Sequence, residues 1–326
     1  MTSTLVLGGT GLLGSHTVTE LLARGYEVTA VSLPGSDHGT LPPEVDAVWA
    51  DVAALSDDEV RDLFRGRHAV FYAIGADERT IPAIPAARFF YQANVVTTQR
   101  TARLAREAGV AKFVLYGSYT AEMGERWTDF GYGRDPYPRT RLLQEEVACL
   151  EGEGAMDVMT LRLPYIFGLV AGQRPLWQFV IDTVTHQQPK VAVLPGTTSA
   201  VTARQVADAA VGAMEHGTHG ATYPINAYNL SYLELNRLAC RAIGRDENDV
   251  VVVPLEAMLP AYAARDEEAR AQGVEHGVPV AHTAIFQSRD AVNDPADCAV
   301  LGIRDDDVVA AIAESFRWCV DHPVTA

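Results

Sequence analysis

A strand that runs directly into a glycine turn and a helix opens the chain. Residues 4–7 form a short apolar run typical of a buried strand, and apolar residues recur at helical spacing over residues 13–22. Between them, Gly8 permits a sharp turn, Gly11 lets backbone N–H groups approach a pyrophosphate, and Gly14 lets the helix lie close to the strand. The positive end of the helix then faces the anion. This stretch predicts a dinucleotide site; the alternative is a turn that joins two core elements and binds nothing.

The charge balance of the chain excludes several classes of partner. Its 326 residues include 26 Lys and Arg against 42 Asp and Glu, a net charge of −16, which disfavours nucleic acid and anionic membrane surfaces. No apolar run approaches the ~20 residues of a bilayer span, and the first strand begins too early for a signal peptide. The four cysteines lack metal-ligand spacing and are expected to be free thiols. We therefore expect a cytoplasmic protein that has no metal site and binds neither nucleic acid nor membrane.

Three residues in the middle of the chain have the chemistry that hydride transfer requires. A strand over residues 112–116 leads to Ser118, and an apparent helix carries Tyr137 and Arg141 four residues apart, on one face. Ser118, at the C-terminal end of a parallel strand, would open onto the same crevice. A phenol can exchange a proton with a carbonyl oxygen, a hydroxyl can orient that oxygen, and a cation can lower the pKa of the phenol. We predict that these three residues are catalytic; the alternative is a Tyr–Arg pair on an ordinary amphipathic helix.

These motifs resemble those of the extended or atypical short-chain dehydrogenases/reductases, a group that includes NAD-dependent epimerases and dehydratases. The G-x-x-G-x-x-G turn at residues 8–14 resembles the start of these chains, and V-L-Y-G-S at residues 114–118 resembles the strand with their catalytic serine. Residues 137–145 are similar to their Y-x-x-x-K-x-x-x-E helix, with Arg141 in place of the lysine. Arginine keeps the positive charge but does not release a proton, so it cannot copy the lysine's compact ribose contact or its proton relay. The resemblance covers nearly the whole chain and is strongest over residues 1–168.

The resemblance implies an α/β fold, a Rossmann-type doubly wound parallel sheet with a smaller C-terminal substrate-binding lobe. Residues 1–168 would form the dinucleotide-binding domain, and residues 200–228 would return to it. Residues 169–199 and 229–326 would form mainly the substrate-binding lobe. Residues 163–168 resemble the turn at which chains of this family leave the cofactor domain.

The same resemblance implies a set of cofactor-binding residues. The family commonly has an acidic residue near the adenine at the position of Asp51, although a turn residue fits the sequence equally well. A long helix predicted over residues 88–107 carries Asn94, which resembles the family's structural asparagine; a polar helix face is the alternative. The predicted cofactor-binding residues are Gly8, Thr10, Gly11, Leu12, Leu13, Gly14, Ser32, Asp51, Val52, Ala73, Ile74, Gly75, Asn94, Tyr116, Tyr137, Arg141, Pro164 and Ile166.

The end of the second predicted strand leaves the choice of cofactor open. NAD-binding members of this fold have Asp or Glu there for the ribose hydroxyls, whereas NADP needs Arg or Lys for its extra phosphate. This chain has the neutral Ser32, with Asp37 and His38 further into the loop. We therefore expect NADP or NAD.

The expected substrate is a small organic molecule with a carbonyl group. Sugar-nucleotide members typically hold the diphosphate with an arginine in the substrate lobe, but residues 195–201 have no basic residue, and Arg174, Lys190 or Arg204 would have to supply the contact. The loop between Ser118 and Tyr137 contains several large side chains. If these side chains line the crevice, they favour a flat, apolar or aromatic substrate; the alternative is that they cap a gap between the two lobes. These side chains are Tyr119, Met123, Trp127, Phe130 and Tyr132.

Together, these features predict an NAD(P)-dependent oxidoreductase that reduces a ketone or aldehyde. Tyr137 would donate the proton, Ser118 would orient the carbonyl, and Arg141 would supply positive charge. One alternative is an NAD-dependent sugar-nucleotide epimerase or dehydratase, and another is a non-catalytic nucleotide-binding or sensor protein in which Arg141 marks lost chemistry. The resemblance also leaves a homodimer open.

Overall fold

Seven parallel strands form the central sheet of the computed structural model, which describes residues 2–36 and 39–323. Their order is β10-β6-β5-β4-β1-β2-β3, so the chain winds outward in one direction from β1 and in the other from β4. This arrangement confirms the predicted Rossmann-type fold, whose ligand crevice opens at the C-terminal ends of the two central strands. The strands are β1 (Ser3–Leu7), β2 (Glu27–Ser32), β3 (Asp46–Trp49), β4 (Ala69–Tyr72), β5 (Lys112–Ser118), β6 (Asp157–Leu163) and β10 (Thr222–Pro224).

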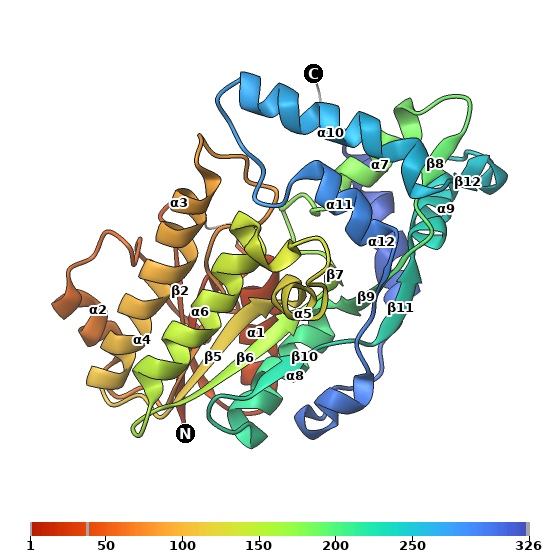
Figure 1. Cartoon of the computed structure of the whole chain (residues 1–326). Coiled ribbons are helices and arrows are strands. Elements are labelled where there is room, and N and C mark those ends of the chain that lie inside the picture. The colour runs from red at the N-terminus through yellow and green to blue at the C-terminus, as the bar shows by residue number, and fades with distance from the viewer. Residues whose placement is uncertain (1, 37–38, 324–326) are drawn as a thin grey trace.

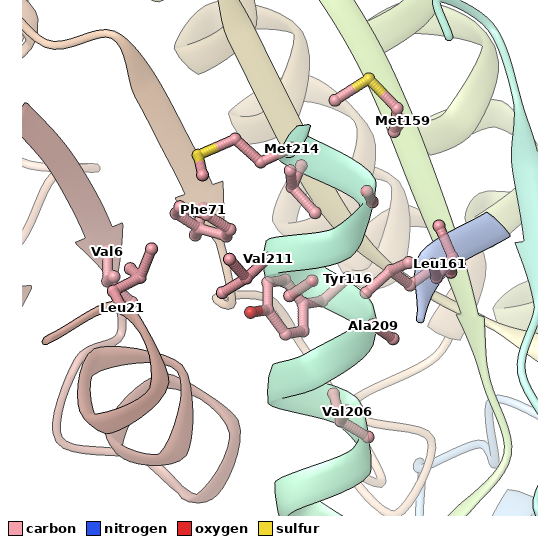
Figure 2. Close-up of a cluster of buried hydrophobic side chains, with 14 of the residues drawn as sticks. Val6, Leu21, Phe71, Tyr116, Met159, Leu161, Val206, Ala209, Val211 and Met214 are labelled. Carbon is pink, nitrogen blue, oxygen red and sulfur yellow. The ribbon is translucent and has the colours of Figure 1, made fainter. Parts of the chain in front are cut away.

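Helices cover both faces of this sheet (Figure 1). Because successive strand residues point to opposite faces, Val6 belongs to one buried cluster, whereas Leu5 and Leu7 belong to another. One face is covered by α1 (Leu12–Ala23) and α8 (Ala203–His216), and the other by α2 (Asp57–Phe64), α4 (Thr97–Glu107) and α6 (Pro136–Gly152). Figure 2 shows the first cluster, in which Phe71, Tyr116, Met159 and Leu161 lie near Val206, Val211 and Met214 of α8.

Local sequence sets the ends of these helices. Ser56 caps α2, because its Oγ accepts a hydrogen bond from the Glu59 N–H at 3.3 Å while the Glu59 carboxylate accepts one from the Ser56 N–H at 2.8 Å. At the end of α1, Gly25 adopts a φ of +81°, which lets the chain reverse into β2.

A second group of elements follows β6 and encloses a core of its own. Its sheet pairs β7 (Tyr165–Phe167), β11 (Tyr228–Ser231) and β13 (Asp290–Ala291) with β9 (Thr197–Thr202), and β8 (Val191–Val193) pairs with β12 (Val250–Val252). The helices are α7 (Gln178–His186), α9 (Tyr232–Ala242), α10 (Leu255–Ala271), α11 (Val280–Gln287) and α12 (Val308–Asp321). Side chains of α7, α9 and α12 fill the core, while α10 lies exposed along the top of Figure 1.

The long helix predicted over residues 88–107 is not one regular α-helix. The structure divides this region into α3 (Ala86–Phe90), a π-helical segment (Tyr91–Val96) and α4. The π-helical segment widens the helix by one residue per turn, a feature that frequently marks functional sites. The region between Ser118 and Tyr137 is also more regular than a loop, since it contains α5 (Tyr119–Arg126).

In residues 2–36 and 39–323, no helix combines the length and the apolar character that crossing a membrane requires. All four cysteines are free thiols; Cys240, Cys298 and Cys319 are buried and Cys149 is half-buried.

Candidate active site

The glycine turn packs the start of α1 tightly onto β1. Gly8 has a φ of +83° and donates from its N–H to the Val31 oxygen at 2.8 Å, and the Gly11 N–H returns to the Gly8 oxygen at 3.0 Å. A Cβ on Gly14 would lie 2.0 Å from that same Gly8 oxygen, so a side chain does not fit there. A Cβ on Gly11 would meet only the Gly8 oxygen, at 3.4 Å. Because no side chain of the described residues caps α1, the N–H groups of its first turn remain for a ligand.

Ser32 stabilises this turn from the end of β2. Its buried Oγ accepts a hydrogen bond from the Thr10 N–H at 3.0 Å, and the Thr10 and Ser36 hydroxyl oxygens are 3.1 Å apart. Ser32 lies where the sequence leaves the choice between NAD and NADP open, and its hydroxyl also stabilises the glycine turn by accepting from Thr10. The loop residues Asp37 and His38 lie outside the described residues.

Asp51 and Val52 lie in the turn that follows β3. The exposed Asp51 carboxylate accepts a hydrogen bond from the Ala53 N–H at 3.0 Å, which is the geometry of a turn residue. Val52 is buried in the core on the α2 and α4 side of the sheet. Neither residue lines the cavity described below.

Asn94 fixes the backbone that follows β4. It is fully buried in the π-helical segment, where its Oδ1 accepts from the Ala76 N–H at 2.8 Å and its Nδ2 donates to the Ala76 oxygen at 3.1 Å. Gly75 has a φ of +145°, and a Cβ there would lie 2.9 Å from the Asn94 Oδ1. The asparagine therefore holds the turn after β4 in place, the backbone-supporting role that the resemblance implies.

Ser118, Tyr137 and Arg141 converge on one cavity. Arg141 is buried; its Nη1 donates to the Tyr137 hydroxyl at 3.3 Å and its Nη2 to the Tyr116 oxygen at 2.5 Å. Ser118 ends β5 and caps α5, with its Oγ 2.9 Å from the Thr120 hydroxyl and accepting from the Thr120 N–H at 3.2 Å. The structure thus brings together the three side chains that the sequence predicts to open onto one crevice.

Burial raises the pKa of Tyr137, and the positive Arg141 opposes this rise. A hydrogen bond from Ser118 also lowers the pKa of this phenol, while the acidic Asp77 and Glu78 raise it. Tyr137 is consequently a neutral phenol near neutral pH, the form that can give a proton to a carbonyl oxygen.

A segment distant in sequence positions Tyr137. The Tyr137 N–H donates to the Gly277 oxygen at 2.8 Å, and the rings of Tyr137 and Phe90 meet edge to face at 5.4 Å. A Cβ on Gly277 would lie 2.6 Å from the Phe90 ring and 3.0 Å from the Tyr137 Cβ. No local sequence pattern indicates this contact.

The cavity has a volume of about 270 Å³ and lies at the C-terminal ends of the strands. Ten of the predicted site residues line it: Leu13, Ala73, Ile74, Gly75, Tyr116, Ser118, Tyr137, Arg141, Pro164 and Ile166. Of the seven other lining residues, the sequence already indicated Tyr119 as a side chain over the crevice and Ala76 as part of the turn after β4. It did not indicate Asp77, Glu78, Gly117, Leu163 and Tyr165 as site residues. Most of these residues are next to predicted site residues at the C-terminal ends of strands. Because ligands bind at these strand ends, that position is the sequence signal that could have identified them as site residues.

The aromatic side chains after Ser118 mostly form a cluster rather than a cavity wall. Trp127 and Tyr132 pack against Phe286, with ring centroids 5.1 Å and 5.4 Å away, and Phe130 lies 5.6 Å from Tyr132. Of the five large side chains considered from the sequence, only Tyr119 lines the cavity among the described residues. These rings therefore give little support to a flat aromatic substrate.

The three basic residues considered for a diphosphate are engaged elsewhere. Arg204 pairs with Asp306 at 2.7 Å, Lys190 with Asp249 at 2.8 Å, and Arg174 donates to Gln178 at 2.7 Å. None of the three lines the cavity.

A comparison with family models decides the family. The model of the NAD dependent epimerase/dehydratase family matches residues 4–230. The chain belongs to this family. Membership confirms the predicted resemblance to extended short-chain dehydrogenases/reductases, and it supports an oxidoreductase whose cofactor is NAD or NADP.

Similar curated proteins include enzymes of sterol metabolism. The human sterol-4-alpha-carboxylate 3-dehydrogenase, decarboxylating, is 28% identical over 173 residues, which are 50% of this chain and 44% of that enzyme. The sterol demethylase protein B of Methylococcus capsulatus is 30% identical over 236 residues, 68% of each chain. The chain thus matches less than half the length of the human enzyme.

Solved structures share the fold over nearly the whole chain. The crystal structure of gox2253 has a TM-score of 0.78 at 21% identity and covers 99% of both chains. DesIV, a dTDP-glucose 4,6-dehydratase from Streptomyces venezuelae with NAD bound, has a TM-score of 0.69 at 18% identity and covers 98% of this chain and 97% of its own. At these identities the likeness shows the fold.

The residues of the site fit a nicotinamide dinucleotide. The uncapped start of α1 offers N–H groups to a pyrophosphate, and the tight glycine contacts keep side chains away from it. The buried Nε of Arg141 has no hydrogen-bond partner among the described residues, so it is a donor without an acceptor. An oxygen of a bound cofactor or substrate would satisfy this donor.

Proposed function

We propose that this protein interconverts a ketone or aldehyde and the corresponding alcohol on a small, uncharged organic molecule, with NAD or NADP as cofactor. The observation that carries this proposal is the convergence of Ser118, Tyr137 and Arg141 on the cavity beside the glycine turn. The bound cofactor supplies or accepts the hydride.

Each of the three side chains has a role in handling the proton and the carbonyl oxygen. Tyr137 gives its proton to the oxygen as the carbonyl is reduced, and the Arg141 guanidinium, 3.3 Å away, stabilises the phenolate that remains. The Ser118 hydroxyl orients the same oxygen, since Ser118 and Tyr137 line the same cavity. In the direction of oxidation the phenolate accepts the proton from the alcohol.

The size and charge of the cavity support a small, uncharged substrate. A volume of about 270 Å³ is at the low end for ligand pockets, and a nicotinamide would share this space. Arg141 is the basic residue of the lining, and it already donates to Tyr116 and Tyr137. A carboxylate or diphosphate would therefore find, among the described lining residues, one remaining cationic donor, the Arg141 Nε, so most of its charge would lose water without a partner, which is costly. The similarity to the human sterol-4-alpha-carboxylate 3-dehydrogenase, decarboxylating, and to a 3-beta-hydroxysteroid dehydrogenase of Mycolicibacterium neoaurum supports an alcohol or ketone as the reacting group. The carboxylate in the name of the human enzyme is not carried over to this chain, because the cavity pairs such a charge poorly.

The test compares Tyr137→Phe with the wild type and with Tyr91→Phe, which removes the hydroxyl of an exposed tyrosine outside the cavity. NADH and NADPH binding is measured by fluorescence titration, and turnover is measured on a panel of uncharged cyclic and aryl ketones. We expect Tyr137→Phe to reduce kcat by at least about a hundredfold while cofactor affinity stays within a few-fold. Tyr91→Phe should match the wild type.

Two results would contradict the proposal. Equal turnover by Tyr137→Phe would remove the tyrosine from the mechanism. Turnover of UDP-glucose without added cofactor, in the absence of activity on the ketone panel, would identify a sugar-nucleotide epimerase instead.

A further inference from the structure

Tyr137 needs a source of protons that its direct neighbours do not provide. In the proposed reaction the phenol loses a proton to the substrate in every turnover and must regain one before the next. Arg141 contacts the hydroxyl, but a guanidinium does not release its protons in proteins. The Ser118 hydroxyl, with its partner Thr120, is a poor acid and can only pass a proton on. The sequence therefore lacks a titratable cation at the position from which a lysine would deliver the proton.

Glu78 is a carboxyl group in the same cavity. It lies in the loop after β4 and lines the cavity together with Tyr137 and Arg141, and solvent still reaches its side chain. No hydrogen bond or ion pair joins its carboxylate to the described residues. The neighbouring Asp77 is different, because its Oδ1 accepts hydrogen bonds from the N–H of Arg79 at 3.0 Å and from the Arg79 Nε at 2.5 Å. Glu78 is thus the unpaired acid of this part of the lining.

The charge of Glu78 acts on Tyr137. The negative Glu78 raises the pKa of the Tyr137 phenol, and the positive Arg141 lowers the pKa of Glu78. The two residues belong to separate elements, the loop after β4 and α6, and both line the cavity. A carboxyl group that lines the same cavity as the phenol, acts on it through its charge and is exposed to solvent is placed to pass protons between solvent and phenol.

We propose that Glu78 returns a proton to Tyr137 through water in the cavity, in place of the proton relay that Arg141 does not supply; this inference rests on the proposed function. In the reducing direction, the Tyr137 O–H bond breaks as the O–H bond of the product alcohol forms. The phenolate then takes a proton from a water molecule, which takes one from the Glu78 carboxyl group. Glu78 regains its proton from bulk solvent. In the oxidising direction each proton moves the opposite way.

The surroundings of Glu78 set the pH range in which it can act. Solvent reaches one part of the Glu78 side chain, but the cavity around it removes part of the water from the carboxyl group. This partial loss of water and the negative Asp77 raise the pKa of Glu78 to about 7, while Arg79 and Arg141 oppose the rise. Both the acid and the carboxylate are therefore populated near neutral pH. The titratable and charged groups that face Glu78 from its own loop, α6, α5, the turn before α6 and β7 are Asp77, Arg79, Tyr137, Arg141, Tyr119, Tyr132 and Tyr165.

The first test is kinetic and uses Glu78→Gln, with Glu267→Gln on the exposed face of α10 as the matched control. The probe is the fastest ketone of the panel above. We expect kcat of Glu78→Gln to fall by ten- to a hundredfold, on the order of a lost proton-transfer group, and Glu267→Gln to match the wild type. The wild-type kcat for reduction should fall as the pH rises through about 7, because Glu78 must be protonated to give a proton. This inflection should be absent in Glu78→Gln.

Chemical rescue separates proton transfer from a structural role. Imidazole, added at constant pH to Glu78→Ala, should raise kcat in proportion to its concentration, because the open cavity admits a small acid that can replace the carboxyl group. The wild type should not respond. In an Arg141→Lys background, where an ammonium group can release a proton, Glu78→Gln should cost less than it does in the wild type.

A substrate-free measurement tests the coupling itself. The ionisation of Tyr137 is followed by tyrosine absorbance as the difference between a protein and its Tyr137→Phe variant, with and without Glu78→Gln. Removing the carboxylate should lower the pKa of Tyr137. An unchanged phenol titration, or a Glu78→Gln variant with wild-type kcat and pH profile, would overturn the relay while leaving the proposed function intact. Full activity of Tyr137→Phe would overturn the proposed function, and the relay with it.

Discussion

Gly14 and Gly11 stand three residues apart, but only Gly14 is needed for the fold. A methyl group on Gly14 would lie 2.0 Å from the Gly8 oxygen, which cannot move without disturbing the turn, whereas one on Gly11 would lie 3.4 Å from it. We predict that Gly14→Ala lowers the free energy of unfolding by roughly 1–3 kcal/mol, as overpacking typically does. Gly11→Ala should keep the wild-type stability but weaken cofactor binding, by about tenfold for a loss of 1.4 kcal/mol.

Urea unfolding and NADPH titration of both variants check this prediction. Equal stability of Gly14→Ala and the wild type would show that α1 can shift away from β1. Unchanged cofactor binding by Gly11→Ala would show that the pyrophosphate does not approach this residue.

At the scale of single residues, the sequence predicts site residues that belong to a local motif. It misses residues that reach the site only because the chain folds back on itself. Ser118, Tyr137 and Arg141 were predicted because strand-end position and helical spacing bring them together. Glu78 lies three residues after the predicted Gly75 and Gly277 lies in a distant segment, and neither belongs to a motif of its own. Their role depends on how the chain folds back, which spacing along the sequence does not encode.

At the scale of elements, Asp306 joins the start of α8 to the start of α12. Its carboxylate accepts hydrogen bonds from the Thr202 hydroxyl at 2.6 Å and from the Nε and Nη2 of Arg204 at 2.8 Å and 2.7 Å. The hydrogen bonds from Arg204 lower the pKa of Asp306 to about 2. Because the ordinary pKa of Asp is about 3.9, this carboxylate contributes stability above about pH 4 that is lost as the pH falls towards 2.

We predict that Asp306→Asn lowers the free energy of unfolding by about 1 kcal/mol at pH 7, since solvent screens part of the interaction. The difference from the wild type should shrink as the pH falls from 5 towards 2. Urea unfolding at a series of pH values measures this difference in the free energy of unfolding. Asp305→Asn, which removes an equal charge at an exposed neighbouring position, is the control and should match the wild type. A difference that is constant with pH would mean that the carboxylate charge does not join these elements.

Element boundaries show where sequence patterns lose information. Apolar spacing predicts a helix over residues 88–107, but it does not distinguish α-helix from the π-helical turn at Tyr91–Val96, because one added residue changes the helical period only locally. That turn carries Asn94, whose hydrogen bonds to Ala76 show why the irregularity matters. The capping box of α2, by contrast, depends on four adjacent residues and forms as its pattern indicates.

For the molecule as a whole, the chain crosses between the two groups of elements more than once. The chain enters the second group after β6, returns to the central sheet with α8 and β10, and then leaves again. The core on the α1 side of the sheet therefore contains side chains from both ends of this excursion, including Val6, Phe71, Val206 and Leu301. Neither group can complete its core from one continuous stretch of chain.

This arrangement predicts that the protein unfolds in one cooperative transition and that cofactor raises its midpoint. With NADPH or NADH at about a hundredfold over Kd, binding to the native state alone adds about 2.7 kcal/mol. For a chain of 326 residues this raises Tm by about 4 °C. Calorimetry of the wild type and of Gly14→Ala, with and without cofactor, measures both quantities. Hydrogen exchange should show added protection at the glycine turn and at the Tyr137 N–H, which donates to the Gly277 oxygen. Two separate transitions, with only one of them shifted by cofactor, would show that the groups fold independently despite the shared core.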